Sequence, residues 1–460
     1  MPDLTADFNM VTSFFGGLFR LFTGNTADAG NGGGSSIFSG FENFLKLLFS
    51  WFEPSQQTPT DNNPAQVASS DSPASVDFPW FNGIHPSKMG TLKDEFSATT
   101  QTQAVLQREQ QALMSLGYNI GGKTADGVFN ASTQHALQEF SNDHGGVKLG
   151  DMPGKLDASV AQAQKDVKSS ASVAQINLQQ AYAMRLASQN SNVSFESILK
   201  LSAAERTFEP GIMTTQKGRQ PGLIQMSPAS WLNTVAEYGS KYGLDSLVSQ
   251  MQVRRDANGH VVSTTVANPQ VKQQILDLRN NMRLSALLGV DYAKHNPVQL
   301  DVAHSYEGEN EVSNQSSLSR FFGKAGNIAC DPSQTPWCAA FANSALGASG
   351  HAEVNGNRLW APDFQNYGTQ VSADKVKSGD VVVFSWGHVA LVDKVYTDSN
   401  GRRMFSYIGG NQSNAVNDHT MSVNDSRASF REPPPNEFAV AEARENALAR
   451  RPPQNNTPSL

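Results

Sequence analysis

The sequence is poor in cysteine and has fewer basic than acidic residues. Of 460 residues only Cys330 and Cys338 are cysteine, which excludes a disulfide framework and a four-cysteine zinc site. Lys and Arg total 35 against 42 Asp and Glu, a formal net charge of −7, which argues against a nucleic-acid-binding surface. With this charge, we expect an anionic polymer to be recognised by shape and hydrogen bonding and not by a basic field.

Motifs that hold metals or nucleotides are also missing. The sequence has no HExxH motif, no P-loop and no Rossmann glycine run, so we expect neither a metal nor a cofactor. A bridge between Cys330 and Cys338 is the alternative to two free thiols, and it would block a nucleophilic role for Cys338.

The N-terminal region lacks a long hydrophobic run. Two Phe-rich stretches, residues 8–22 and 37–52, are shorter than a typical membrane span and carry charges. Apolar residues of the second stretch recur at helical spacing, which predicts an amphipathic helix within a region 1–53. This region either packs on the main body or contacts a membrane or partner transiently. Its acidic start does not resemble a Sec-type signal. Residues 54–90 form a Pro- and Ser-rich linker.

A chain of 460 residues is expected to form several domains. Residues 91–166 are predicted to form one of them, a compact helical segment. Helices are predicted at 105–116, ending at Gly117, and at 132–140. The order "LQ…L…LGY…DGVFN…T…AL…F" resembles the small helical peptidoglycan-binding domain of wall hydrolases. Asn130 departs from the glycine usual in that family.

Residues 173–297 have helical periodicity and contain a glutamate, Glu205, near the end of an apolar helix. The helix is closed by Phe and Pro, and "GLIQMSPASW" follows. These motifs resemble the soluble lytic transglycosylases and goose-type lysozymes, and the resemblance extends through "LLGVDYA". It implies that Glu205 is the acid and base for glycan cleavage and that Gly222, Gln225 and Tyr292 contact the glycan. Arg206 departs from the usual serine.

One carboxyl group suits this chemistry. Glycosidases generally use two carboxyl groups. A transglycosylase needs only one, because the hydroxyl of the muramic acid itself attacks after the same residue switches from acid to base. Glu205 needs a raised pKa, which an apolar pocket would supply. The competing interpretations are a solvated helix glutamate and a degenerate domain that binds glycan without cutting it.

The C-terminal segment carries a cysteine followed fifty residues later by a histidine. Thr335 and Pro336 are good N-cap and N1 residues, so we expect Cys338 in the first turn of a helix, where the helix dipole favours a thiolate. Short buried strands are predicted at 381–384, 389–392 and 405–408. His388 at the start of the second strand would form an ion pair with the sulfur.

The runs "TPWCAAFANSAL", "SGDVVVF", "GHVALV" and "GGNQSNAV" resemble the CHAP-like, papain-related cysteine amidases and peptidases over residues 302–432. By this resemblance Cys338 attacks an amide carbonyl and His388 protonates the leaving amine. Asn411 is our choice for the residue that orients the imidazole, and Gln412 is the second choice. Trp337 is expected to contact substrate.

The expected fold is therefore multidomain: an all-α wall-binding domain, an all-α lysozyme-like domain and an α+β papain-like domain, followed by a disordered tail at 433–460. The expected function is a bifunctional peptidoglycan hydrolase that is secreted or reaches the periplasm without a Sec signal, through a specialised secretion system or from a phage. Its partners are then peptidoglycan, a secretion apparatus and an immunity protein. The alternatives are a wall-binding structural component with dead sites and a cysteine protease that cuts proteins.

Overall fold

The structure is a computed structural model that describes residues 103–205 and 222–450. Every described residue belongs to one compact unit, Val76–Leu460. The predicted amphipathic region 1–53 and the linker 54–90 therefore lie outside the described residues. No helix within the described ranges is both long and apolar enough to cross a membrane.

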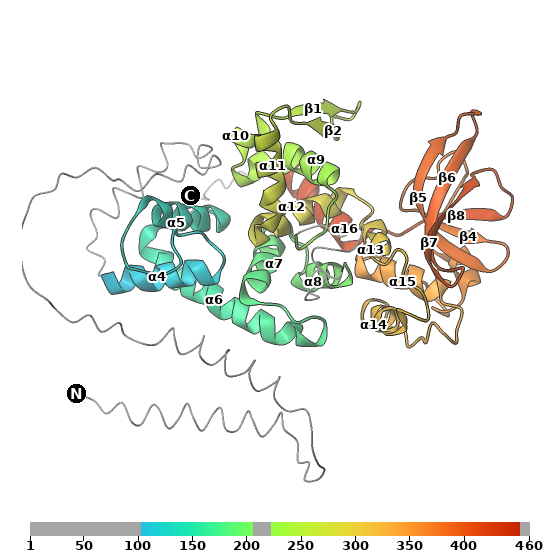
Figure 1. Ribbon diagram of the computed structural model, residues 1–460, viewed down its shortest axis with the longest axis horizontal. Helices are drawn as coiled ribbons and strands as arrows, with labels where there is room; N and C mark the ends of the chain where they lie inside the picture. The colour runs from blue at the N-terminus through green and yellow to red at the C-terminus, as the bar shows by residue number, and fades with distance from the viewer. Residues whose placement is uncertain (1–102, 206–221, 451–460) are drawn as a thin grey trace, which may run out of the picture. The chain divides into compact units, whose positions relative to one another are not determined.

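The first described segment is helical (Figure 1). Its helices are α4 (Gln103–Ser115), α5 (Ala131–Asp143) and α6 (Met152–Ser169), with short 3-10 turns η2 (Leu149–Asp151) and η3 (Ser170–Ser172). Gly117 follows α4 with a φ of +92°, as its predicted capping role requires. Asn130 accepts a hydrogen bond from the backbone N–H of Thr133 and is the N-cap of α5. The asparagine that stands where the family usually has glycine therefore stabilises the start of this helix.

The middle segment is helical but contains a β-hairpin. Its elements are α7 (Leu178–Ser191), α8 (Phe195–Ala204), α9 (Pro228–Tyr238), η4 (Gly239–Tyr242), α10 (Asp245–Val248), β1 (Gln252–Arg255), β2 (Val261–Thr265), α11 (Pro269–Asp277), η5 (Leu278–Asn280) and α12 (Met282–His295). Strands β1 and β2 pair antiparallel. The prediction that residues 173–297 are all-α is thus wrong at this hairpin, whose exposed strands carry only a weak apolar pattern.

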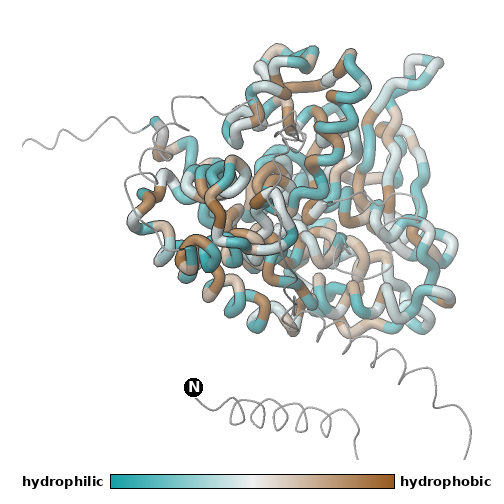
Figure 2. Tube along the Cα trace, turned by 60° about the vertical axis from the view of Figure 1, so that its left-hand side comes forward, coloured by the Kyte–Doolittle hydropathy of each residue, from teal (hydrophilic) through white to brown (hydrophobic). Residues whose placement is uncertain are grey.

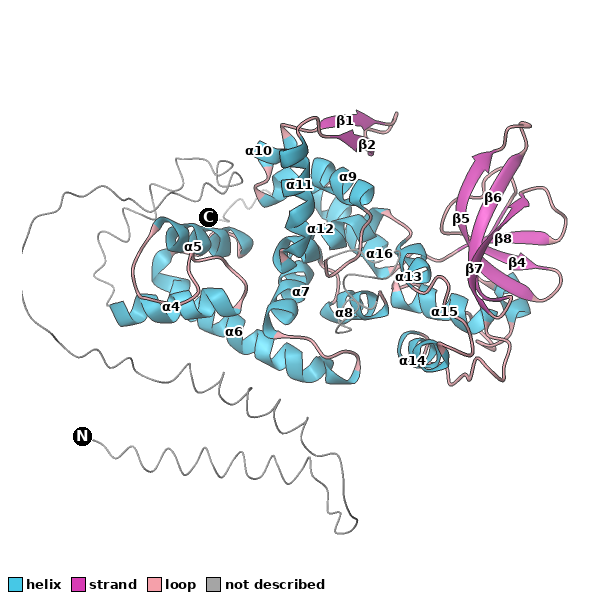
Figure 3. Ribbon diagram, in the orientation of Figure 1, coloured by secondary structure: helices cyan, strands magenta, loops and turns pink. Residues whose placement is uncertain are grey.

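The C-terminal segment combines helices with one antiparallel sheet. Its elements are α13 (Val298–Ser305), α14 (Gln315–Ala325), α15 (Cys338–Ala348), η6 (Ala361–Asn366), β3 (Thr369–Val371), β4 (Val381–Phe384), β5 (His388–Thr397), β6 (Arg403–Gln412), β7 (Ala415–Ser422) and β8 (Ala428–Glu432). The strand order is β3-β8-β4-β5-β6-β7, and Figure 3 shows the strands of this sheet in magenta. The three predicted strands are confirmed within β4, β5 and β6, and the α+β class holds here.

Side chains alternate between the two faces of this sheet. Val383, Val389 and Leu391 belong to the same buried cluster as the alanines of α15, whereas Val382 and Ala390 belong to a second cluster. This period of two is what a strand buried on both faces produces. It fixes α15 against β5 and β6 and thereby sets the position of Cys338.

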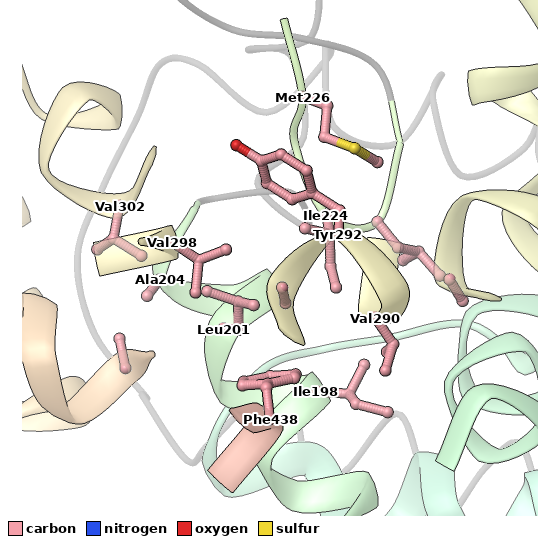
Figure 4. Packing of buried hydrophobic residues seen from close by; sticks show 14 of the residues in the cluster. Ile198, Leu201, Ala204, Ile224, Met226, Val290, Tyr292, Val298, Val302 and Phe438 are labelled. Carbon is pink, nitrogen blue, oxygen red and sulfur yellow. The ribbon is translucent and has the colours of Figure 1, made fainter. Parts of the chain in front are cut away.

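The last helix corrects the predicted tail. Residues 433–460 were expected to be disordered, but α16 (Glu437–Ala449) is a packed helix, and residues 451–460 lie outside the described ranges. Phe438 is fully buried and lies beside Ile198 and Leu201 of α8 (Figure 4). Glu437 accepts hydrogen bonds from Ser194 and Ser197. This helix is hard to predict from the sequence because only two of its apolar residues, Phe438 and Ala441, are fully buried, which gives a weak helical periodicity.

Packing does not stop at the predicted domain boundaries. One cluster of buried apolar residues continues from Ala112 in α4 to Ala441 in α16, and apolar and polar stretches alternate along the helices that contribute to it (Figure 2). Arg283 of α12 forms ion pairs with Glu139 and Asp143 of α5 at 2.8 and 2.9 Å. The boundaries themselves stay predictions, because shared packing does not exclude separate domains.

Candidate active sites

Cys338 is the first residue of α15. The residue before the helix is Trp337, whose side chain makes no capping hydrogen bond, so the predicted cap at Thr335 is wrong while the first-turn position of Cys338 is right. Ala339, Ala340 and Ala342 are buried, and their small side chains let the helix lie close to the sheet.

The Cys338 thiol is buried against the start of β5. It lies within hydrogen-bonding reach of the backbone N–H groups of Val389, Ala339 and Cys338 itself, and each of these lowers its pKa. Burial outweighs them and raises the pKa of the thiol above its ordinary value of 9.0. The sulfur is therefore a thiol at neutral pH. The prediction of a resting thiolate is wrong, because burial disfavours the anion.

His388 opens β5, immediately before the residue that contacts the thiol. Gly387, at a φ of +84°, makes the turn from β4, and the imidazole stacks on Phe384 with ring centroids 5.7 Å apart. Burial lowers the pKa of His388 to about 4, although a hydrogen bond with the Gln412 side chain raises it. Its Nε2 atom is buried without a hydrogen-bond partner. At neutral pH the imidazole is thus uncharged and able to accept a proton.

Gln412, the second choice, is the side chain that reaches the imidazole. The pairing of β6 with β7 shifts between Gly409 and Gln412, and Asn411 adopts a left-handed φ of +58°. This bulge turns the strand so that Gln412 is buried and donates from its amide to the carbonyl oxygens of Gly409 and Asn417. The role predicted for Asn411 stays a prediction; it assumed that Gly409-Gly410 ends the strand, whereas β6 continues to Gln412.

Trp337 lies in the core and not on a binding surface. Its side chain is fully buried, its indole N–H donates to Glu311 Oε2 at 3.1 Å, and its ring packs on Phe341. The expected substrate contact is therefore corrected to a supporting role at the start of α15. Gly410 makes the close approach possible, since a Cβ there would lie 2.5 Å from the Trp337 ring.

Glu205 follows the last residue of α8 and is completely buried. Its Oε2 atom accepts a hydrogen bond of 2.6 Å from the backbone N–H of Gln225, while Oε1 has no hydrogen-bond partner. The Gln225 side-chain amide donates to the backbone carbonyl of Glu205 at 2.9 Å. Burial raises the pKa of Glu205 well above its usual range, and the charge of Asp301 raises it further. This direction favours the protonated form, which a general acid needs.

Of the other predicted glycan-site residues, Gln225 and Tyr292 lie near this carboxyl group, whereas Gly222 shapes the turn before Leu223. Gly222 has a φ of +116°, and an added Cβ would lie 2.5 Å from the Ser285 hydroxyl, so the turn admits only glycine. The Tyr292 hydroxyl donates to Asp301 Oδ2 at 3.0 Å. Burial raises the pKa of Asp301 to about 7. Sequence reasoning missed Asp301, whose only signal is an acid among apolar residues of α13.

The two cysteines are both free, so no bridge blocks Cys338. Burial and the charge of Asp331 raise the pKa of the Cys330 thiol to about 11. Across the described residues, no group of three or more His, Cys, Asp or Glu side chains is placed to hold a metal ion.

The sheet, the thiol at a helix start and an imidazole on the residue before Val389 are the parts that a cysteine amidase or peptidase uses. A family model described as CHAP domain matches residues 330–411, a range that holds Cys338 and His388 and ends one residue before Gln412. This part of the chain is accordingly a C-terminal CHAP domain, and peptidoglycan is the substrate it implies. No curated protein matches the chain.

Proposed function

We propose that the protein is a bifunctional peptidoglycan hydrolase in which Cys338 cuts an amide in or next to the stem peptide and Glu205 cuts the glycan strand. The observation that carries the proposal is the buried thiol of Cys338 against the N–H of Val389, one residue after His388. The Glu205 half rests on the buried carboxyl group, whose pKa is raised, and on its hydrogen bond from the backbone N–H of Gln225.

The amide chemistry follows from two neutral groups. His388 takes the thiol proton as the Cys338 sulfur attacks the carbonyl carbon, and backbone N–H groups at the start of α15 stabilise the oxyanion. The imidazolium then gives that proton to the leaving amine as the carbon–nitrogen bond breaks. Water hydrolyses the thioester with His388 as base, which restores the thiol. Gln412 keeps the imidazole oriented through the cycle.

The glycan chemistry begins from the acid form of Glu205. Its proton passes to the glycosidic oxygen as the bond to the muramic acid breaks. The resulting carboxylate then accepts a proton from the attacking hydroxyl, either that of the muramic acid itself or that of a water molecule. The first route leaves an anhydro end and the second a reducing end.

Mass spectrometry of digested sacculi tests both halves. We expect free stem peptides or cleaved cross-links from Cys338 and new glycan ends from Glu205. Each product set should vanish separately in Cys338→Ala and Glu205→Gln proteins. Products that consist only of protein fragments, when proteins are offered, would favour a cysteine protease.

A second candidate is a wall-binding structural component of a secretion or injection apparatus with one or both sites inactive. The complete burial of Glu205 favours it, because a working acid must reach its substrate. Wall binding without any clearing in zymograms would support this candidate.

Export by a specialised secretion system forms the last part of the proposal, with region 1–53 as a docking element for that apparatus and an immunity protein as a further partner. Deletion of residues 1–53 should abolish export and leave the activity of purified enzyme unchanged. Loss of activity with normal export would contradict this assignment.

A further inference from the structure

An exposed tryptophan lies beside the proposed catalytic histidine of the CHAP domain. Trp386 occupies the turn between β4 and β5, two residues before His388, and half of its surface (51%) is exposed. Tryptophan is highly buried on average in folded proteins, because its large apolar surface is costly to leave in water. An indole left open at this position is therefore a candidate contact for substrate.

The turn holds the indole in a fixed place. The Ser385 N–H donates to the carbonyl oxygen of Arg427 at 2.9 Å. The Gly387 N–H donates to the carbonyl oxygen of Phe384 at 3.0 Å, so hydrogen bonds fix the backbone on both sides of Trp386. The Phe384 ring also stacks on the indole, with centroids 4.4 Å apart and an angle of 20° between the planes. A ring that is ordered before substrate arrives loses little conformational entropy on binding.

A chain of rings joins the indole to the imidazole. Phe384, which stacks on Trp386, also stacks on His388, with centroids 5.7 Å apart and an angle of 24°. Val389, whose N–H faces the Cys338 sulfur, follows His388 directly. A group bound at the indole therefore lies at the histidine end of the proposed cysteine site.

An ion pair without net charge borders the indole. The guanidinium carbon of Arg427 lies over the indole, 5.5 Å from its centroid. Arg427 donates to both carboxylate oxygens of Asp425, at 2.9 and 2.7 Å, so the two charges offset each other. The Arg427 side chain is 59% exposed, and these two bonds use two of its five N–H groups. The border of the indole thus offers hydrogen-bond donors and acceptors to a neutral polar ligand.

We propose that Trp386 and the Arg427–Asp425 pair form a saccharide subsite for the muramic acid ring, so that Cys338 cuts the amide between this sugar and the stem peptide. The inference rests on the proposed function and names which amide is cut. The C–H groups on one face of a pyranose ring carry weak positive charge and match the negative face of an indole. Sugar hydroxyl and acetamide groups both donate and accept hydrogen bonds, as the ion pair does.

This choice of ligand decides the reaction. A carboxylate of the stem peptide would favour an unpaired cation, whereas Arg427 is already paired with Asp425. With the muramic acid ring on the indole, the Cys338 sulfur attacks the lactyl carbonyl carbon, and the amino group of the stem peptide leaves with the proton from His388. Water then cleaves the thioester and releases the lactyl carboxylate.

Initial rates of the full chain carrying Glu205→Gln test the proposal without glycan cleavage. The probes are a purified disaccharide-tetrapeptide and a cross-linked peptide dimer that has no sugar. We expect the first to give free disaccharide and free tetrapeptide, and the second to be cut at least about tenfold more slowly. Trp386→Ala should raise KM for the first probe about tenfold with kcat nearly unchanged, because stacking stabilises ground state and transition state alike. Trp386→Phe should recover most of this loss, since phenylalanine keeps a ring.

Tyr396→Ala is the matched control, because Tyr396 is an exposed aromatic residue (41%) near the far end of β5, and KM should stay at the parent value. An unchanged KM in Trp386→Ala would overturn the proposal, as would equal cleavage of the sugar-free dimer.

Calorimetric titration of the disaccharide-tetrapeptide into the full chain carrying Cys338→Ala and Glu205→Gln separates the subsite from the proposed function. We expect Trp386→Ala to weaken this binding about tenfold. Such weakening, in a protein whose wild-type chain cuts neither probe and clears no sacculi, would contradict the proposed function and leave the saccharide subsite standing. Equal binding with and without the indole would remove the subsite.

Discussion

Burial raises the pKa of the reactive group in both the Glu205 and the Cys338 site, but the consequence for catalysis differs. Both side chains are buried, with relative exposures of 0% and 6%, and burial raises the pKa of each. For a carboxyl group this preserves the proton that a general acid must give away. For a thiol, the raised pKa lowers the population of the thiolate, which is the nucleophile. The same desolvation therefore prepares one group and handicaps the other.

The cysteine site offsets this handicap through its neighbours. Three backbone N–H groups face the sulfur and lower its pKa, and the His388 imidazole is neutral at neutral pH with a lone pair free, although the same burial makes it a weaker base. The site is thus arranged for proton transfer at the moment of attack and not for a standing ion pair. Among the described residues, the Glu205 carboxyl group accepts from one backbone N–H and lies near Asp301, without a neighbouring imidazole.

The largest effect should come from removing the acid. Glu205→Gln keeps the shape and the bond from Gln225 but has no proton of the required acidity, so glycan cleavage should fall by at least about 10³-fold. Amide cleavage should stay at the wild-type level, measured on the same sacculi. Unchanged glycan cleavage would remove Glu205 from the mechanism.

A smaller loss should separate Gln412 from Asn411. Gln412→Ala removes the side chain that hydrogen-bonds to His388, and we expect amide cleavage to fall about 10²-fold in kcat with little change in KM. Asn411→Ala should lower kcat less, because the bulge at 409–412 makes Gln412 the side chain that hydrogen-bonds to His388. Asn411 would regain its predicted role if the order of the two losses were reversed.

Alkylation by iodoacetamide should distinguish the neutral pair from an ion pair. In a Cys330→Ser background, the raised pKa of Cys338 predicts a rate that stays low at neutral pH and climbs only as the pH approaches and passes 9. A rate that is already maximal and constant from pH 5 to pH 8 would establish the ion pair instead.

The mildest effect should be on stability. The folded-state pKa of Asp301 is raised from 3.8 to about 7, so the folded chain holds this proton more tightly than the unfolded chain, and the stabilisation is lost as pH rises from about 4 through about 7. Asp301→Asn removes this loss and can still accept the Tyr292 hydrogen bond. Its melting temperature should match the wild type at pH 4 and exceed it at pH 8.

Asp418→Asn is the control for this measurement, because Asp418 is exposed on β7. A melting-temperature difference that is the same at both pH values would mean that Asp301 does not titrate as its burial implies.

Local patterns in the sequence predicted local features well. The glycine after α4, the strands around Gly387-His388 and the first-turn position of Cys338 each depend on a few neighbouring residues. Features that depend on distant packing were missed. The burial of Trp337, the bulge that selects Gln412 and the partnership of Asp301 with Tyr292 all arise where separate elements meet.

The charge of the thiol was mispredicted for the same reason. A helix start favours the anion, and Thr335 and Pro336 predicted the start to within a few residues even though the cap itself is Trp337. The cost of removing the sulfur from water depends on β5 and β6, which lie more than forty residues downstream.

The return of α16 to the middle of the chain governs how this protein can be divided. Phe438 fills a slot against α8, and Glu445 pairs with Lys294 of α12 at 2.7 Å. A piece ending at residue 432 would keep the whole sheet yet leave that slot open to water. An isolated C-terminal piece would conversely carry a helix with an uncovered phenylalanine. Either activity is thus better isolated by a point substitution in the full chain than by truncation.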